Sequence, residues 1–285
     1  MYGQEALVWW CAVLGGLAVV GYGRSLAGAT RAQRRVRVLG RIVGIEAPVH
    51  GSRNVGGVPV VISFQDPSTG EEFTLANNGG SGDTVEAAWQ GREIGIRYRP
   101  GRPEDFDVDD DLWWGRYGVG WPNFAVFLIY AALVTSAALT WGYPWALLGA
   151  GVPWTVATVI AFRKEVGAAR RRVADLTAAP TAPGRIVAVT RSEYHDSEGT
   201  LVAYGPVVRF TTRDDVAVTG FCPRGKKDLS GSVGQDVTVR YLPADPAVFT
   251  LDLADDRREL RSTVRFDGSL FLAGVAAVVI GLVQL

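Results

Sequence analysis

The sequence contains very few of the residues that build metal, thiol and acid–base sites. Among its 285 residues there are only two histidines and two cysteines. Two histidines are too few for a histidine-built zinc site, and Cys11 and Cys222 lie far apart in segments of different character. They therefore form no plausible disulfide or metal set. We expect no metal, no cofactor and no thiol chemistry.

Charge is also scarce, and it is balanced. Charged residues make up 20% of the chain and hydrophobic residues 48%, whereas a typical soluble domain has about 25% charged residues. Lys+Arg 29 against Asp+Glu 29 gives a formal net charge of +0. Without a positive excess, nucleic acid is not an expected partner. The apolar, weakly charged composition favours a membrane protein.

The longest stretch without charge runs from Tyr117 to Phe162. A membrane crossing takes roughly 20 helical residues, so this stretch allows two crossings. Gly142 and Pro144, flanked by aromatic residues, mark a turn between them. One more apolar segment lies near each end of the chain. We predict transmembrane helices at 6–23, 120–140, 145–162 and 268–285.

The first apolar segment has a second interpretation as a cleaved signal peptide. Ala27-Gly28-Ala29 would suit a cleavage site, but no Lys or Arg precedes the apolar run. We expect the segment to be retained as a helix. The predicted crossings contain no Asp, Glu, Lys, Arg or His, which argues against ion-coupled transport and proton relays.

Small residues suited to close helix packing or self-association recur every four positions in two of these helices. They are Ala12 and Gly16 in the first helix, and Ala273, Ala277 and Gly281 in the last. Pro153 should kink the third helix, with Thr155 or its neighbours satisfying the freed backbone groups.

Arginines follow the first and third apolar segments and precede the fourth. Basic residues near a membrane end favour the cytoplasmic side, so the regions between the outer and inner helices should be cytoplasmic and both termini outside. We expect a multi-pass protein of the cell (inner or plasma) membrane. The candidate membrane-surface contacts are Arg34, Arg35, Arg37, Arg170, Arg171 and Arg172.

Two soluble segments, 38–111 and 184–256, show the alternating pattern of β-strands. In the first we predict strands at 38–46, 58–64, 71–75, 94–98 and about 106–108, and a short helical turn at 85–89. Five short strands suit a small closed antiparallel barrel, which removes exposed edges. Barrels like the oligonucleotide-binding fold and like SH3 domains both fit. The predicted class is membrane α + β.

The two segments repeat the same elements in the same order. Gly40-Arg-Ile-Val43 matches Gly184-Arg-Ile-Val187, and Gly91–Pro100 matches Gly234–Pro243. The copies are separated by about 145 residues, which is too long for a solenoid repeat. We predict duplication of a unit built as helix, β module and helix.

The shared signature is Gly-Arg-Ile-Val, then Pro-Val-Val-x-Phe, then Gly-x-x-Val-x-Val-Arg-Tyr-x-Pro. With its flanking membrane helices it resembles the bacterial membrane-protein family known as domain of unknown function 3592. The second copy follows it from Gly184 through Gly234 to Pro243, and the first copy departs at Ser63 and Arg99. The resemblance implies a membrane-anchored β module and carries over no catalytic residue.

Several motifs approach known sites but lack an essential part. The segment 220–227 resembles a phosphate-binding loop without its magnesium-binding hydroxyl and its helix. The acidic runs 104–111 and 252–256 lack calcium-loop spacing, so we expect an acidic collar that faces the arginine clusters or solvent. Within it, the pairs Asp109/Asp110 and Asp255/Asp256 are predicted to form salt bridges with the arginines at 34–37 and 170–172. His50 and His195, each expected in a loop, have no placed nucleophile.

The pairs Arg97-Tyr98 and Arg240-Tyr241 could form a basic and aromatic surface for single-stranded nucleic acid. Neighbouring residues of a strand point to opposite faces, so we favour a structural role for them.

Together these patterns predict a scaffold or interaction protein rather than an enzyme, because no nucleophile–base pair is found. Its expected partners are the lipid bilayer and an unidentified protein or a second copy. The alternative is a sensor of lipid head groups or small ligands near the arginine clusters.

Overall fold

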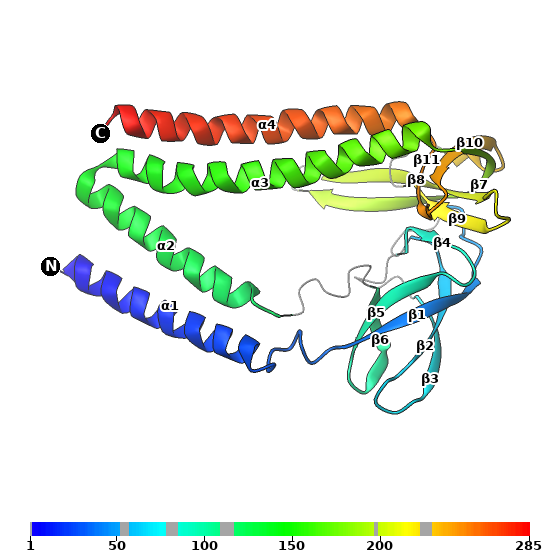
Figure 1. Cartoon of the computed structure of the whole chain (residues 1–285), viewed down its shortest axis with the longest axis horizontal. Helices are drawn as coiled ribbons and strands as arrows, with labels where there is room; N and C mark the ends of the chain where they lie inside the picture. Colours follow the sequence, from blue (N-terminus) through cyan, green and yellow to red (C-terminus); the bar gives the residue numbers. More distant parts are fainter. Residues whose placement is uncertain (1, 52–56, 78–84, 109–116, 197–198, 223–229) are drawn as a thin grey trace. The chain divides into compact units, whose positions relative to one another are not determined.

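The computed structural model describes residues 2–51, 57–77, 85–108, 117–196, 199–222 and 230–285 (Figure 1). The chain divides into two compact units. We call Met1–Arg34, Gly115–Arg171 and Arg257–Leu285 the helical unit, and Arg35–Trp114 with Arg172–Asp256 the β unit. The helices are α1 (Tyr2–Leu26), α2 (Gly120–Trp141), α3 (Tyr143–Ala178) and α4 (Leu253–Val283).

The four predicted apolar segments are all helical, and each helix is long and apolar enough to cross a membrane. The predicted segments 145–162 and 268–285 are too short as helices. α3 continues past Phe162 to Ala178, and α4 begins at Leu253. Hydropathy marks only the apolar part of a helix. The added turns are rich in Arg and Ala, which are good helix formers.

α3 and α4 run antiparallel, side by side (Figure 1). A Cβ atom built on Gly281 would lie 3.0 Å from Leu148 Cγ, and one on Gly274 would lie 2.6 Å from Thr155 Oγ1. The Trp154 indole also donates to the Leu270 carbonyl, with 3.1 Å between Nε1 and O. The small-residue face predicted on the last helix is therefore used within the chain.

Substituting Gly274 by leucine should weaken the α3–α4 pair by about 1–3 kcal/mol, because the added side chain overpacks a closed contact. Gly268→Leu on the same helix is the control, since a Cβ there meets nothing within 4 Å. Unfolding of the full chain in mixed micelles with increasing dodecyl sulfate measures both. Equal losses in the two variants would contradict this packing.

Pro153 lies inside α3 and cannot donate a hydrogen bond to the carbonyl of Gly149. The hydroxyl of Tyr130, on α2, donates to that carbonyl. Thr155, expected to take this role, donates instead to Gly151 with 2.7 Å between Oγ1 and O. The carbonyl freed by proline thus links α3 to α2.

α1 packs against α2 through Leu14, Ala18 and Ala125, which are all buried. At one end of the pair the Tyr22 hydroxyl donates to Asn123 Oδ1 at 2.6 Å.

The first sheet of the β unit is antiparallel, in the order β3-β2-β1-β5-β6. Its core side chains alternate along the strands as the sequence predicted, with Ile42, Ile62 and Ile96 fully buried. The strands are β1 (Val36–Ile45), β2 (Val60–Gln65), β3 (Glu72–Ala76), β5 (Glu93–Arg99) and β6 (Arg102–Val108). Each predicted strand of this segment is present.

The second sheet has the order β11-β10-β7-β8-β9-β4 and includes one strand from the first half of the chain. That strand, β4 (Ala87–Ala88), pairs with β9, and Phe221 N donates to Glu86 O at 2.6 Å. The helical turn predicted at 85–89 is wrong, because pairing with a distant strand overrides the local preference of alanine. The others are β7 (Thr181–Asp196), β8 (Gly199–Thr211), β9 (Ala217–Phe221), β10 (Asp236–Leu242) and β11 (Asp245–Thr250).

The two halves of the β unit match strand by strand. The order β3-β2-β1-β5-β6 corresponds to β9-β8-β7-β10-β11. The pairing register shifts between Ile42 and Gly44 in the first half, and between Ile186 and Ala188 in the second. A bulge re-aims a strand, so its recurrence at the same place means that both sheets curl at the same point.

The glycine just before β5 in the first half and the glycine just before β10 in the second half make the same backbone contact. Gly91 has a φ of 86° and Gly234 a φ of 85°, which residues other than glycine rarely adopt. Their N–H groups donate to Ile42 O and Ile186 O, both at 2.8 Å. The glycine that opens this motif, Gly-x-x-Ile in the first copy and Gly-x-x-Val in the second, thus has a backbone role.

Each half also encloses a cluster of three aromatic rings. Centroids are 5.5 Å apart for Phe64 and Tyr98, and 5.6 Å apart for Phe210 and Tyr241. Both tyrosines are 1% exposed, so they belong to the core and not to a binding surface. The clusters are Phe64, Tyr98 and Phe106 in the first half and Phe210, Tyr241 and Phe249 in the second.

The buried hydroxyl of Tyr98 lies near the Asp66 carboxylate but makes no hydrogen bond of good geometry. Burial, followed by this carboxylate, raises the pKa of Tyr98 to about 12. The Ser68 hydroxyl and backbone N–H donate to Asp66 Oδ1 at 2.6 and 2.7 Å, and they lower the pKa of Asp66.

This raised pKa predicts a loss of stability in alkali. The unfolded chain loses the Tyr98 proton near pH 10, while the folded chain keeps it to about pH 12. The contribution of Tyr98 is complete below pH 10 and is lost as pH rises to about 12. Between these pH values the midpoint temperature of thermal unfolding should fall as pH rises. It should fall less in Tyr98→Phe than in the wild type and in the exposed control Tyr117→Phe. If the midpoint of Tyr98→Phe falls as steeply as that of the wild type, ionisation of Tyr98 is not the cause of the loss.

Candidate functional site

Some of the arginines predicted to contact the membrane surface are held in ion pairs within the fold, and others are exposed. Arg35 is in the first group. Its guanidinium donates to Asp107 Oδ2 in the β unit. Arg97, from β5, reaches the same oxygen at 3.3 Å. Asp107 belongs to the acidic run expected to face the arginines or solvent, although the residues predicted to pair with these arginines were Asp109 and Asp110. Asp109–Asp111 lie outside the described residues.

Arg172 is engaged as well, at the start of the second half of the β unit. Its Nε lies 3.5 Å from Asp256 Oδ1, and its Nη2 donates to the Phe249 carbonyl at 3.0 Å. The Asp256 side chain is only 3% exposed. The predicted pairing of 170–172 with the acidic residues at 252–256 is confirmed for these two residues. The Arg172 side chain thus joins the end of β11, at Phe249, to the first turn of α4, at Asp256.

The remaining predicted contacts differ in exposure. Arg37 is half buried in the β unit. Arg34, Arg170 and Arg171 are exposed in the helical unit. Further exposed arginines cover the polar turns of the two long helices, which the sequence analysis had placed outside the membrane helices. They are Arg163 on α3 and Arg257, Arg258, Arg261 and Arg265 on α4.

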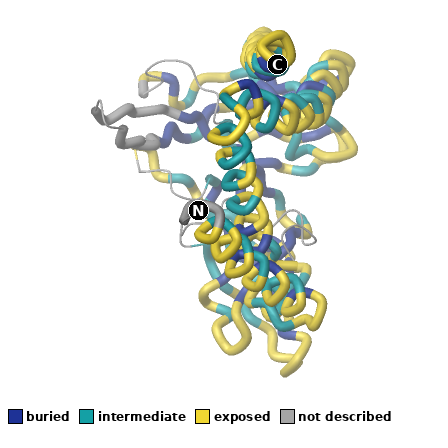
Figure 2. Tube along the Cα trace, turned by 90° about the vertical axis from the view of Figure 1, so that its left-hand side faces the viewer, coloured by how far each residue is buried: buried dark blue, intermediate teal, exposed yellow. Residues whose placement is uncertain are grey.

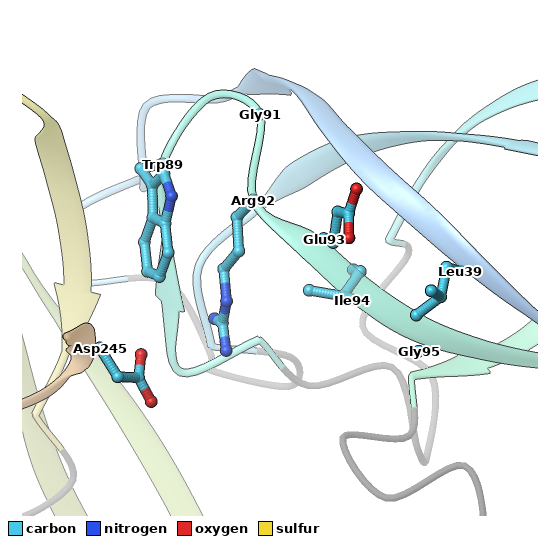
Figure 3. Close-up of a pocket in the computed structure, with 8 residues that line it drawn as sticks. All are labelled: Leu39, Trp89, Gly91, Arg92, Glu93, Ile94, Gly95 and Asp245. Carbon is cyan, nitrogen blue, oxygen red and sulfur yellow. The ribbon is translucent and has the colours of Figure 1, made fainter.

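An open cleft of about 600 Å³ lies in the β unit (Figure 3). Trp89, Arg92 and Asp245 lie together at one end of it. The Arg92 guanidinium lies 5.0 Å from the centre of the Trp89 ring and donates to Ala87 O. The other lining residues are Leu39, Gly91, Glu93, Ile94 and Gly95.

The charged groups of this cleft already have structural partners. Asp245 Oδ1 accepts a hydrogen bond from Ala247 N at 3.1 Å, and Glu93 pairs with Arg41 at 3.3 Å. Among the described residues that line it, none is a histidine, serine or cysteine that could serve as a nucleophile or base. The cleft could not be predicted from the sequence, because its lining comes from β1, the β4–β5 turn, β5 and the start of β11.

The remaining motifs take structural positions. His50 is exposed, and its Nδ1 accepts a hydrogen bond from Val189 N at 3.3 Å. His195 lies in strand β7, opposite Thr200, and not in a loop as predicted. The long β7–β8 hairpin extends the strand beyond the length suggested by the first copy. Gly220 lies in β9, while 223–227 of the loop-like motif fall outside the described residues.

Among the described residues no group of three or more His, Cys, Asp or Glu side chains could hold a metal ion. The two cysteines are free thiols. Figure 2 shows where exposure concentrates: much of the helices is exposed, whereas buried residues gather in the sheets. No known protein family, curated protein or solved structure matches this chain.

Proposed function

We propose that this chain is a multi-pass protein of the bacterial inner membrane that presents the β unit to the cytoplasm as a scaffold. The observation that carries the proposal is the contrast between apolar helix surfaces and arginine-rich helix ends. Trp9, Phe127, Ile160 and Leu272 are each at least 60% exposed on the helices. Apolar side chains in such numbers would be covered by lipid.

Exposed arginines support the proposed orientation. Arg24 lies in the last turn of α1, and Arg163 and Arg265 flank the apolar parts of α3 and α4. The positive-inside rule would place these ends in the cytoplasm, with both termini and the α2–α3 turn outside. The internal duplication and the resemblance to domain of unknown function 3592 stay predictions, and both agree with a membrane-anchored β module.

A scaffold role is favoured over an enzyme by how the polar groups of the β unit are used. Asp107, Asp256 and Asp66 all hold the fold together through hydrogen bonds or ion pairs. The tyrosines of the repeated Arg-Tyr element fill the cores. Polar side chains committed to structure support a role in presenting a surface.

Co-purification tests this function. The full chain, solubilised from native membranes after brief chemical cross-linking, should elute with a partner or a second copy. The variant Phe210→Ala, which should disrupt the β unit, should lose that species, while the exposed Leu39→Ala should keep it. A wild-type chain that stays monomeric and unlinked would overturn the scaffold proposal.

The alternative, a sensor of lipid head groups, gains support from one observation. Arg170 and Arg171 are exposed, whereas the neighbouring Arg172 is not available because it holds Asp256. The predicted lipid contacts that stay exposed, Arg34, Arg170 and Arg171, therefore all belong to the helical unit.

A further inference from the structure

We propose that the outer edge of β3 pairs with the same edge of a second copy of this chain. The two strands run antiparallel about a two-fold axis at Thr74. The inference rests on the scaffold function proposed above and deepens it, because it names the surface that is presented and the partner that binds there.

The outer edge of β3 carries backbone groups that no described residue binds. β3 is the outermost strand of the first sheet, with β2 beside it (Figure 1). Backbone groups along such a strand face its neighbour at every second residue. Asn77 N, just after β3, donates to Val60 O on β2 at 3.0 Å, and the pairing of the two strands is regular. The residues whose N–H and C=O groups point outward are therefore Glu72, Thr74 and Ala76.

The equivalent edge in the second half of the β unit is covered by an added strand. β9 takes the place of β3 there, and β4 pairs with its outer side. Ala88 lies opposite Thr219, and Phe221 N donates to Glu86 O at 2.6 Å. The same edge of this fold thus accepts a short antiparallel strand through its outward backbone groups.

The other outer strands have features that oppose pairing with a further chain. β6 and β11 each contain a proline, Pro103 and Pro246, and each pairs with its neighbour through a shift in register. Proline has no N–H to donate. β4 is only two residues long. β3 contains no proline, lysine or arginine.

The single charge of β3 is directed away from its outer edge. Glu72 Oε1 accepts a hydrogen bond from the Ser63 hydroxyl, on β2, at 2.6 Å. The carboxylate therefore leans over the sheet and leaves the outer side of the strand clear. Among the outer strands of the β unit, β3 is the one suited to pair with another chain.

The sequence of β3 fits a copy of itself. With the axis at Thr74, this residue faces Thr74 of the second copy and Glu72 faces Ala76, so every outward residue meets an outward residue. About six backbone hydrogen bonds form, and no like charges meet. On the core side, the half-buried Phe73 faces Leu75 of the second copy. Cross-strand pairs of this kind stabilise a sheet.

Membrane insertion makes so small a contact sufficient. One pair of five-residue strands is well below the roughly 1,600 Å² that a stable interface between free proteins buries. Chains confined to one membrane meet at a higher effective concentration than chains in solution. The pairing of β3 is therefore expected in the membrane and not for a dilute soluble fragment.

Energy transfer between fluorescent labels tests this pairing in vesicles. In the full chain with Cys11→Ala/Cys222→Ala, Gln65→Cys places one label on an exposed residue of β2. From the spacing of strands and residues, the two label sites lie about 20 Å apart in the dimer, well within the range of energy transfer. Copies carrying donor and copies carrying acceptor are reconstituted together. Transfer should persist when the protein is diluted in excess lipid.

Charges placed at Thr74 separate this edge from chance association. Thr74→Lys and Thr74→Glu should each weaken the pairing about tenfold or more, because like charges meet at the axis. A mixture of the two variants should recover the transfer, since opposite charges then meet, and this recovery also shows that both variants fold. Thr69→Lys, in the exposed turn before β3, is the matched control and should keep the transfer.

The inference is overturned if wild-type copies show no transfer, if Thr74→Lys keeps it, or if the mixture does not recover it. Cross-linking from native membranes distinguishes this failure from failure of the proposed function. A chain that is linked to another protein but shows no transfer contradicts only the pairing of β3. A chain that neither associates with itself nor is linked to another protein contradicts the scaffold function as well.

Discussion

Replacing Phe210 by alanine should lower the free energy of unfolding of the β unit by about 3–5 kcal/mol. Phe210 is 2% exposed, and its ring centroid lies 5.6 Å from those of both Tyr241 and Phe249. Alanine removes the ring from a closed core and leaves a cavity that the paired strands cannot fill. Such a loss is a large part of the stability of an ordinary domain.

Phe64→Ala should have an effect of the same size, because Phe64 holds the matching place beside Tyr98 and Phe106. Leu39→Ala is the control, since Leu39 is 64% exposed and its truncation should cost less than about 0.5 kcal/mol. Urea unfolding of the full chain in detergent, monitored by hydrogen exchange of β-strand amides, measures the loss of stability in all three variants. If Phe64→Ala and Phe210→Ala lower the free energy of unfolding no more than Leu39→Ala does, the rings do not form these cores.

Replacing Arg172 by alanine should cost about 2–4 kcal/mol. Breaking a fully buried ion pair typically costs roughly 3–5 kcal/mol, because the remaining charge is left without a partner. The Asp256 side chain is 3% exposed but that of Arg172 is 33% exposed, so water reaches one side of the pair and lowers the loss. The Phe249 carbonyl also loses its hydrogen bond from Arg172.

Two variants separate this ion pair from a general effect of charge. Arg171→Ala removes an exposed neighbour and should change stability by less than about 0.5 kcal/mol. The double variant Arg172→Met/Asp256→Leu should recover most of the loss, because no unpaired charge remains. The same urea titration reports both. A double variant as unstable as Arg172→Ala would mean that the arginine acts through packing instead of its charge.

Much of the fold follows from local sequence patterns. The four helices were predictable because charge disappears over long segments, and the strands of the first sheet because Val60, Ile62 and Phe64 alternate. The end of α3 and the start of α4 were not predictable, because hydropathy does not detect the polar turns of a helix that extends beyond its apolar part. β4 was missed because Ala87 and Ala88 become a strand only through pairing with β9.

The candidate sites were predictable only in part. An acidic run and an arginine run suggested the pairing of Arg172 with Asp256, but only the fold shows that this pairing withdraws Arg172 from the surface. The Trp89 and Arg92 cleft likewise depends on segments joined by tertiary contacts.

Accessibility of single cysteines on the two sides of the membrane tests the central claim most directly. In a Cys11→Ala/Cys222→Ala background, Trp141→Cys marks the α2–α3 turn and Asp214→Cys marks an exposed turn of the β unit. An impermeant maleimide should label position 141 only in right-side-out vesicles and position 214 only in inside-out vesicles. Labelling of position 214 from the outer face, or of both positions from one face, would contradict a four-crossing protein with a cytoplasmic β unit.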